Sequence, residues 1–227
     1  LPWRPDSRSY IFVPGAFFDK MLQSRVAQSV AQKPQACPCK LHNNGRRAVK
    51  VTAFQNVANT PGKPQLIKMP DKVSAMGSLK KGAPVELWQH DAYKGPLGPE
   101  DIDIQVTHNG LCHTDCHMID DDWGVSAFPF VPGHEVVGYV AAVGANVKGL
   151  KVGDRVGYAW MIDSCGTCAN CVAGNESICL KGYTGLITAG GKGGWQSFMR
   201  APARFAFRIP DALPSTPAAP LLCAGVT

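Results

Sequence analysis

Long apolar runs are absent from this 227-residue sequence. A membrane-spanning helix needs about 20 consecutive apolar residues, and the longest candidates here are interrupted by Pro, Gly or a charged residue within a few positions. This excludes a helical membrane-spanning protein, and we expect no membrane partner. Hydrophobic residues nevertheless make up 45% of the chain, enough for one sizeable core with an extension or for two small domains.

Acidic residues are missing from one stretch of the chain, Met21 to Pro70, which holds eight Lys or Arg. Residues 71–227 carry 12 basic and 15 acidic side chains, so the net charge of +6 belongs to the N-terminal part. The charge therefore does not indicate a nucleic-acid-binding surface on the folded region.

The N-terminal residues divide into three segments by composition. Residues 21–53 are rich in Ala, Gln and Arg and resemble an organellar transit peptide, most like a plastid one. The alternative is a basic leader without a targeting signal, or translated flanking sequence, and the protein would then be cytoplasmic. Residues 1–20 begin with Leu and carry no recognisable pattern, so they stay an unassigned leader. Residues 54–82 contain three prolines and few large apolar residues, and we expect a linker there.

Nine cysteines are present, and seven of them lie beyond residue 53. An odd number fits a fully paired disulfide framework poorly and favours metal ligation in a reducing compartment. Four of the seven form a C-x2-C-x2-C-x7-C run: Cys165, Cys168, Cys171 and Cys179. Four thiolates at this spacing can converge on one tetrahedral Zn²⁺ at about 2.3 Å each, and the closed coordination predicts a structural zinc. Two disulfides or an iron–sulfur cluster are the alternatives.

A closed four-cysteine zinc loop also occurs in ribbons that bind nucleic acids. Residues 163–181 contain only Asp163, Glu176 and Lys181 as charged residues, and no aromatic residue that could stack on a base. The local sequence thus argues against nucleic acid as a partner. A non-enzymatic zinc-binding domain, structural or nucleic-acid-binding, remains the alternative function.

A second group of metal-ligand residues is spread along the chain. Cys112 follows an alternating segment at 101–106 that predicts a strand, and His134 and Glu135 follow a Pro-Gly turn about twenty residues later. Cys223 can supply a third ligand. Three protein ligands leave one coordination position for water or a substrate oxygen, as a catalytic zinc requires.

Several of these motifs carry a resemblance to a known family. Residues 133–147 resemble the zinc signature of the medium-chain zinc-dependent alcohol dehydrogenases, and the four-cysteine run has that family's structural-zinc spacing. Residues 112–115 (Cys-His-Thr-Asp) are similar to its first catalytic-ligand motif. The continuation at 118–124 narrows the match to the cinnamyl alcohol dehydrogenase-like branch. The resemblance covers about residues 83–227.

The resemblance implies roles for individual residues. It places Cys112, His134 and Cys223 on a catalytic zinc, with Glu135 as a nearby or transient ligand. Asp115 is similar to the carboxylate that orients the zinc-binding histidine. The proton relay and the cofactor contacts would involve Thr114 as the hydroxyl on the alcohol oxygen and cofactor, His117 as the outer relay histidine, and Thr227 beside the nicotinamide.

Two features depart from the family pattern. Cys116 stands where the family commonly has another side chain; we interpret it as inert, with a redox-sensitive neighbour or a competing ligand as alternatives. The G-x-G-x-x-G turn of a Rossmann domain is also absent, because the glycine run at 190–194 lacks the third glycine and precedes a predicted strand. We therefore expect a chain that stops before the cofactor domain, through an incomplete gene model or a real truncation.

The fold expected for residues 83–227 is mainly β. Short strands are predicted at 85–89, 102–108, 136–143, 155–160, 195–200 and 205–209. The resemblance implies a GroES-like partly open barrel with the structural zinc loop as an excursion. It also implies two zinc ions, NADP as cofactor, an alcohol or aldehyde as substrate, and a homodimer when full length. Without a cofactor domain, we expect the chain to be inactive alone.

Overall fold

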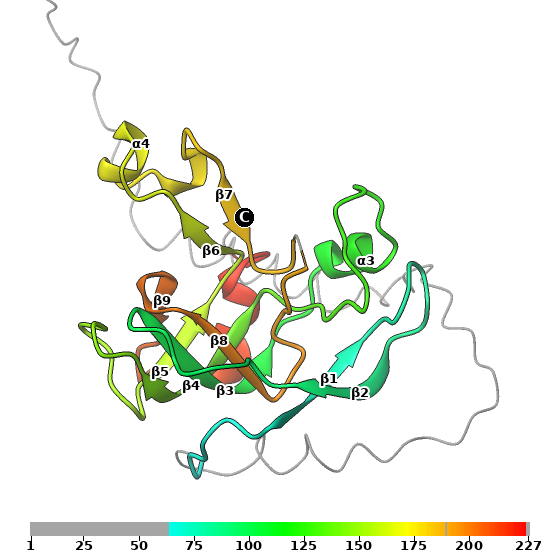
Figure 1. The fold of residues 1–227 in the computed structure, drawn as a ribbon, viewed down its shortest axis with the longest axis horizontal. Coiled ribbons are helices and arrows are strands. Elements are labelled where there is room, and N and C mark those ends of the chain that lie inside the picture. Colours follow the sequence, from blue (N-terminus) through cyan, green and yellow to red (C-terminus); the bar gives the residue numbers. More distant parts are fainter. Residues whose placement is uncertain (1–63, 189, 226–227) are drawn as a thin grey trace, which may run out of the picture. The chain divides into compact units, whose positions relative to one another are not determined.

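The computed structural model describes residues 64–188 and 190–225. Strands dominate this region, as the sequence predicts (Figure 1). An antiparallel sheet of order β8-β3-β4-β5-β9 forms its centre. Its strands are β3 (Asp101–Asn109), β4 (Val136–Val143), β5 (Arg155–Tyr158), β8 (Phe198–Pro202) and β9 (Ala206–Arg208).

Two smaller antiparallel sheets extend the central one. The first pairs β1 (Lys72–Gly77) with β2 (Glu86–Asp91), and the second pairs β6 (Met161–Ser164) with β7 (Tyr183–Gly185). Backbone hydrogen bonds from Met76 N to Trp195 O and from Ser197 N to Ser74 O join β1 to the segment that leads into β8. The β1–β2 sheet therefore continues the central sheet around a partly open barrel.

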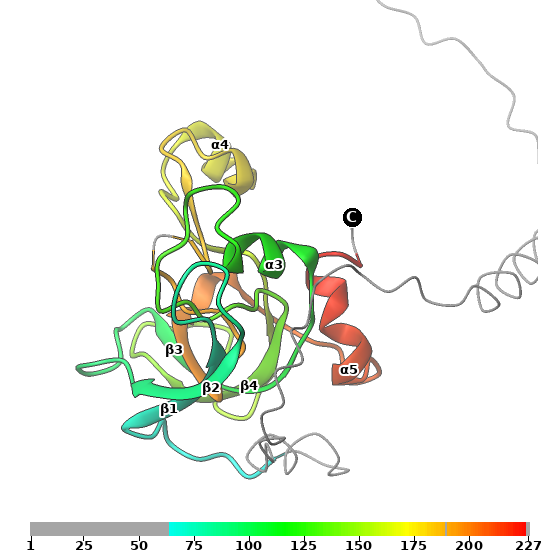
Figure 2. The ribbon, with the colours of Figure 1, turned by 90° about the vertical axis from the view of Figure 1, so that its right-hand side faces the viewer.

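Short helices fill the connections between these strands. They are α3 (His113–Ile119), α4 (Ala169–Val172) and α5 (Ser215–Ala218), with 3-10 turns η1 (Glu176–Ile178), η2 (Ala203–Phe205) and η3 (Pro220–Leu222). Helix α3 lies between β3 and β4 in the chain, and α5 lies near the C-terminal end of the described residues (Figure 2). Within this part of the chain, no helix is long and apolar enough to cross a membrane.

Strand β3 is buried more completely than its alternating sequence predicts. Ile102, Ile104 and Val106 face the main core, as expected for one side of a half-buried strand. Asp103 and Gln105 on the other side are buried too. Each has a polar partner there: Arg200 donates two hydrogen bonds to Asp103, at 2.7 and 3.1 Å, and the backbone N–H of Ile67 donates to Gln105 Oε1 at 3.1 Å. These partners let a central strand carry polar residues inside the fold.

The expected linker at 54–82 requires a correction. Strand β1 occupies residues 72–77, and three of its six residues are buried. Val73 and Ala75 are fully buried. Alternate small apolar residues pack inside while the backbone pairs with β2 along the whole strand, so residues 72–77 belong to the folded domain and not to a linker. Residues 54–63 of this segment, and the leader and transit-peptide segments at 1–20 and 21–53, lie outside the described residues.

Candidate metal centres

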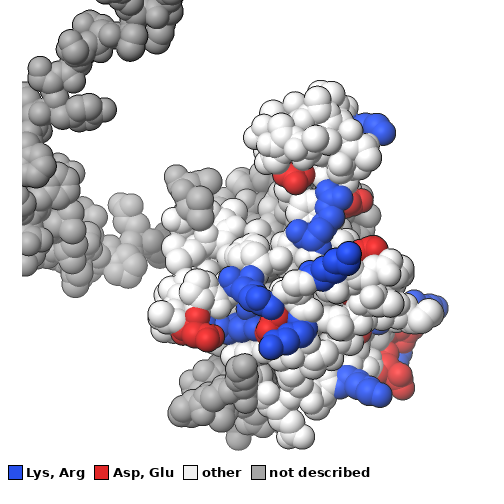
Figure 3. Space-filling model, turned by 90° about the vertical axis from the view of Figure 1, so that its left-hand side faces the viewer, with Lys and Arg blue, Asp and Glu red and all other residues white. Residues whose placement is uncertain are grey.

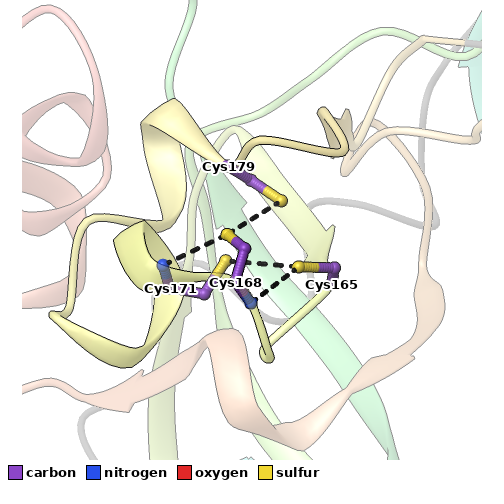
Figure 4. Close-up of side chains that lie close together, drawn as sticks. All are labelled: Cys165, Cys168, Cys171 and Cys179. Atoms are coloured by element: carbon purple, nitrogen blue, oxygen red, sulfur yellow. Dashed lines mark hydrogen bonds between the residues drawn. The ribbon is translucent and has the colours of Figure 1, made fainter.

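The four cysteines of the C-x2-C-x2-C-x7-C run meet at one point (Figure 4). Their sulfur atoms all lie within 4.8 Å of one another. The Sγ atoms of Cys165 and Cys171 are 3.8 Å apart, and those of Cys168 and Cys179 are 4.0 Å apart. These separations exclude S–S bonds of about 2.05 Å and fit the edges of a tetrahedron around one zinc ion.

Backbone N–H groups of the same loop point at these sulfurs. Cys168 N lies 3.4 Å from Cys165 Sγ, and Leu180 N lies 3.5 Å from Cys168 Sγ. Hydrogen bonds from the backbone N–H groups of Thr167 and Cys168 lower the pKa of Cys165 to about 5. Because a thiolate is the form that binds metal, these hydrogen bonds favour metal binding at Cys165.

The loop around this site has little hydrophobic core of its own. Val172, Ile178 and Leu180 are 74%, 62% and 72% exposed. On the face shown in Figure 3, the lobe that contains α4 carries almost no charged side chain. We therefore predict that this lobe depends on a bound metal for its order.

The second predicted group also converges. Ligand atoms of Cys112, His134, Glu135 and Cys223 all lie within 4.8 Å of one another, and the two sulfurs are 4.0 Å apart. Cys112 caps the N-terminus of α3, directly after β3, whereas His134 and Glu135 are fully buried immediately before β4. Cys223 follows η3 at the other end of the domain sequence.

Asp115 organises three parts of this second site. Its fully buried carboxylate accepts hydrogen bonds from Cys112 N at 3.2 Å, Gly133 N at 2.8 Å and His134 Nδ1 at 3.2 Å. The Nδ1 proton of His134 is thereby assigned to the Asp115 side, which leaves Nε2 as the ligand atom. The structure thus supports the orienting role that the resemblance implies for Asp115.

Two buried polar atoms at this site show that it fits a cation. His134 Nε2 and Glu135 Oε2 have no hydrogen-bond partner among the described residues, although both are shielded from solvent. Such atoms are costly to bury unless something binds them. Two thiols, an imidazole and a carboxylate match the ligand set of Zn²⁺. The other oxygen of Glu135 accepts a hydrogen bond from Ala224 N at 3.2 Å, so this side chain also holds the backbone beside Cys223.

The electrostatics of the ligands differ between the two thiols. Burial favours the neutral form of Cys112, but hydrogen bonds from the backbone N–H and the hydroxyl of Thr114 lower its pKa. Burial and the neighbouring Cys112 raise the pKa of Cys223 to about 11. For His134, burial acts to lower the pKa, but the carboxylate of Asp115 raises it overall. Metal binding must therefore displace protons from this site.

The remaining predicted residues fall in two places. Thr114 is half-buried on α3 and contacts Cys112, whereas His117 lies one turn later with Nδ1 2.7 Å from Asp122 Oδ2. Cys116 is half-buried on the same helix and belongs to neither metal-binding cluster. Thr227 lies outside the described residues.

Trp160 is a neighbour of the site that the sequence does not indicate. Its ring packs edge-on against the imidazole of His134, with centroids 5.5 Å apart and planes at 90°. The sequence places Trp160 only at the end of a predicted strand. The contact is tertiary and has no local signal in the sequence.

Comparison with known proteins identifies the family. Residues 98–211 match the sequence profile of the alcohol dehydrogenase GroES-like domain. The chain belongs to this family. The partly open barrel is therefore a GroES-like domain, and the resemblance to zinc-dependent medium-chain alcohol dehydrogenases is confirmed.

Individual relatives agree with this assignment. A probable cinnamyl alcohol dehydrogenase 6 of Oryza sativa subsp. japonica is 47% identical over 57% of this chain and 38% of the relative. A cinnamyl alcohol dehydrogenase structure from Sorghum bicolor superposes with a TM-score of 0.63 at 36% identity, covering 69% of this chain and 46% of the other. A structure titled as CAD from Helicobacter pylori, complexed with NADP(H), gives a TM-score of 0.63 at 28% identity, over 70% of this chain and 47% of that one. The chain thus spans less than half the length of these relatives.

Proposed function

We propose that this chain supplies the zinc-binding catalytic half of an oxidoreductase that interconverts a primary alcohol and an aldehyde with NADP(H). The observation that carries the proposal is the convergence of Cys112, His134, Glu135 and Cys223, where the buried Nε2 of His134 has no hydrogen-bond partner in the part of the chain that the structure describes. The names of the relatives, cinnamyl alcohol dehydrogenase and a complex with NADP(H), support the substrate class and the cofactor.

We call the second metal site, formed by Cys112, His134, Glu135 and Cys223, the open site, because its ligands leave one coordination position for substrate. Cys112, His134 and Cys223 would bind it, and Glu135 lies beside them with one carboxylate oxygen directed into the cluster. A zinc ion bound there supplies Lewis acidity, which stabilises negative charge on the substrate oxygen in either direction of the reaction. Asp115 keeps His134 in the tautomer that leaves Nε2 available as a ligand.

Thr114 and His117 would conduct the proton. A bound nicotinamide cofactor would supply the hydride acceptor for the oxidation, and Thr114 would take up the proton of the alcohol hydroxyl. The two residues stand three apart on α3, a spacing that places them on one side of a helix. Asp122 binds Nδ1 of His117 and so fixes the ring for proton transfer. We propose Thr227 as a contact to the nicotinamide.

The isolated chain should be inactive for a physical reason. Hydride transfer needs the nicotinamide in contact with the substrate carbon, and such positioning reaches effective molarities on the order of 10⁵ M. Thr114 and Thr227 alone are too few contacts to offset the lost freedom of a cofactor taken from solution.

The test joins a dinucleotide-binding domain of the family after Thr227 and follows NADPH oxidation with cinnamaldehyde. We expect turnover by the joined protein, none by the chain alone, and loss of turnover in the joined Cys112→Ser variant. Steady turnover by the chain alone would show that the cofactor is bound elsewhere than proposed. Salt-dependent binding of oligonucleotides by a joined protein that reduces no aldehyde would favour the non-enzymatic alternative.

The location of the protein is a separate proposal. Residues 21–53 have the basic, acid-free composition of a plastid transit peptide. A fluorescent reporter fused after residue 53 should enter plastids if they act as one. Uniform cytoplasmic fluorescence would identify them as a leader without an address.

A further inference from the structure

The glycine run at 190–194 lies directly against the segment that carries His134. Gly193 N donates to Val131 O at 2.8 Å, Gly194 N donates to Gly133 O at 2.7 Å, and Trp195 N donates to Pro132 O at 2.9 Å. Three consecutive carbonyls before His134 are therefore held by three consecutive N–H groups of one loop.

Glycine is required for this close approach. A Cβ atom at residue 193 would overlap the carbonyl oxygens of Pro132 and Gly133. A Cβ atom at residue 194 would overlap the side chains of Asn109 and Val136. The two backbones can meet only because neither residue has a side chain.

The far side of the loop is fixed by a buried amide. Gln196 is fully buried, and its Nε2 donates to Gly193 O at 2.8 Å and to Lys192 O at 3.3 Å. Its Oε1 lies 2.9 Å from Nε2 of His90, which is also buried. Because the amide nitrogen of Gln196 already donates to two carbonyls, Oε1 is the acceptor and His90 Nε2 carries the proton. Every polar atom of the Gln196 side chain is thus used to hold the loop in place.

Hydrogen bonds therefore fix both the N–H and the carbonyl group of Gly133. Its N–H donates to Asp115 Oδ1 at 2.8 Å, and its carbonyl accepts from Gly194 N. Asp115 also accepts from the imidazole of His134. The carboxylate of Asp115 fixes the orientation of the imidazole of His134, and the glycine loop fixes the position of the backbone just before His134.

We propose that the segment Gly193–Gln196 is a positioning element for the open metal site, which fixes the backbone before His134 so that Nε2 meets the sulfurs of Cys112 and Cys223. The inference rests on the proposed function, since it presumes zinc at that site. It gives the glycine run a role other than phosphate binding. None of its residues contacts substrate or cofactor in this account.

The test measures zinc affinity at both sites of the full chain with a chromophoric chelator in competition. In Gly193→Ala we expect about 10- to 100-fold weaker binding at the open site, the range for groups that orient metal ligands, and unchanged binding at the four-cysteine site. Gly144→Ala is the matched control. A Cβ there would also overlap two carbonyl oxygens, those of Gly98 and Pro99, but it lies beyond the far end of β4 from His134. This control should lose stability and keep both affinities.

A second variant makes the test independent of the folding of Gly193→Ala. Gln196→Met keeps the length of the side chain but removes both donors to the loop, and it should weaken the open site about tenfold. Two results would overturn this inference and leave the proposed function standing. One is wild-type zinc affinity at the open site in a folded Gly193→Ala variant or in Gln196→Met. The other is an equal loss of zinc affinity at the open site in Gly144→Ala. A wild-type chain that binds no zinc at the open site would overturn the proposed function itself, and the inference with it.

Discussion

The two metal centres of this chain are built in opposite ways. The four-cysteine site takes all its ligands from 15 consecutive residues, on a lobe whose apolar side chains are largely exposed. The open site takes its ligands from three distant segments, and these segments pack against the two hydrophobic clusters of the domain. From this difference we predict that metal is needed for folding in the first region and for chemistry in the second.

The largest effect should follow from breaking the four-cysteine site. Cys168→Ser removes a ligand whose sulfur also accepts from Leu180 N and Cys171 N. We expect loss of one zinc per chain and a fall in the free energy of unfolding of about 3 kcal/mol or more, because the lobe has no core to replace the metal. Elemental analysis and thermal unfolding would check this.

Cys112→Ser is the counterpart at the open site. It should also lose one zinc, yet change the free energy of unfolding by only about 1 kcal/mol, because β3 and α3 keep their packing without the metal. Equal destabilisation by Cys112→Ser and Cys168→Ser, measured under the same conditions, would contradict the division into a structural and a catalytic zinc.

Asp115→Asn sharpens the comparison without removing a ligand. The amide keeps the shape of the side chain but loses a charged acceptor shared by His134 and two backbone N–H groups. We expect about 10- to 100-fold weaker zinc binding at the open site and unchanged binding at the four-cysteine site. Zinc titration in the presence of a competing chelator would measure both; a fall in affinity at the four-cysteine site would show that the sites are coupled.

The smallest effect is expected at the base of the lobe. Arg204 donates to Ser164 O at 3.2 Å and also contacts Ser164 Oγ, just before Cys165. Arg204→Met should cost about 1 kcal/mol of stability through these lost hydrogen bonds. Zinc affinity at the open site should be unaffected, and a change there would argue that the lobe and the barrel are not independent.

The sequence predicts the ligands of both sites but little of what supports them. The Cys165–Cys179 spacing is local, and the segment around His134 carries a family signature, so both are visible without a structure. Trp160, Gln196 and His90 act through contacts between residues far apart in the chain, which leave no local pattern. The sequence does not indicate strand β1, because its inward-facing residues are small and prolines precede it. It does not indicate helix α3 either, because seven residues are too few to show a helical period.

Stepwise removal of zinc from the wild-type chain tests the central claim most directly. The account predicts two zinc ions per chain: a chelator takes the first with no change in far-ultraviolet circular dichroism, and removal of the second unfolds the four-cysteine lobe. Binding of a single zinc, or release of both ions in one step with loss of the fold, would contradict the separation of a catalytic from a structural centre.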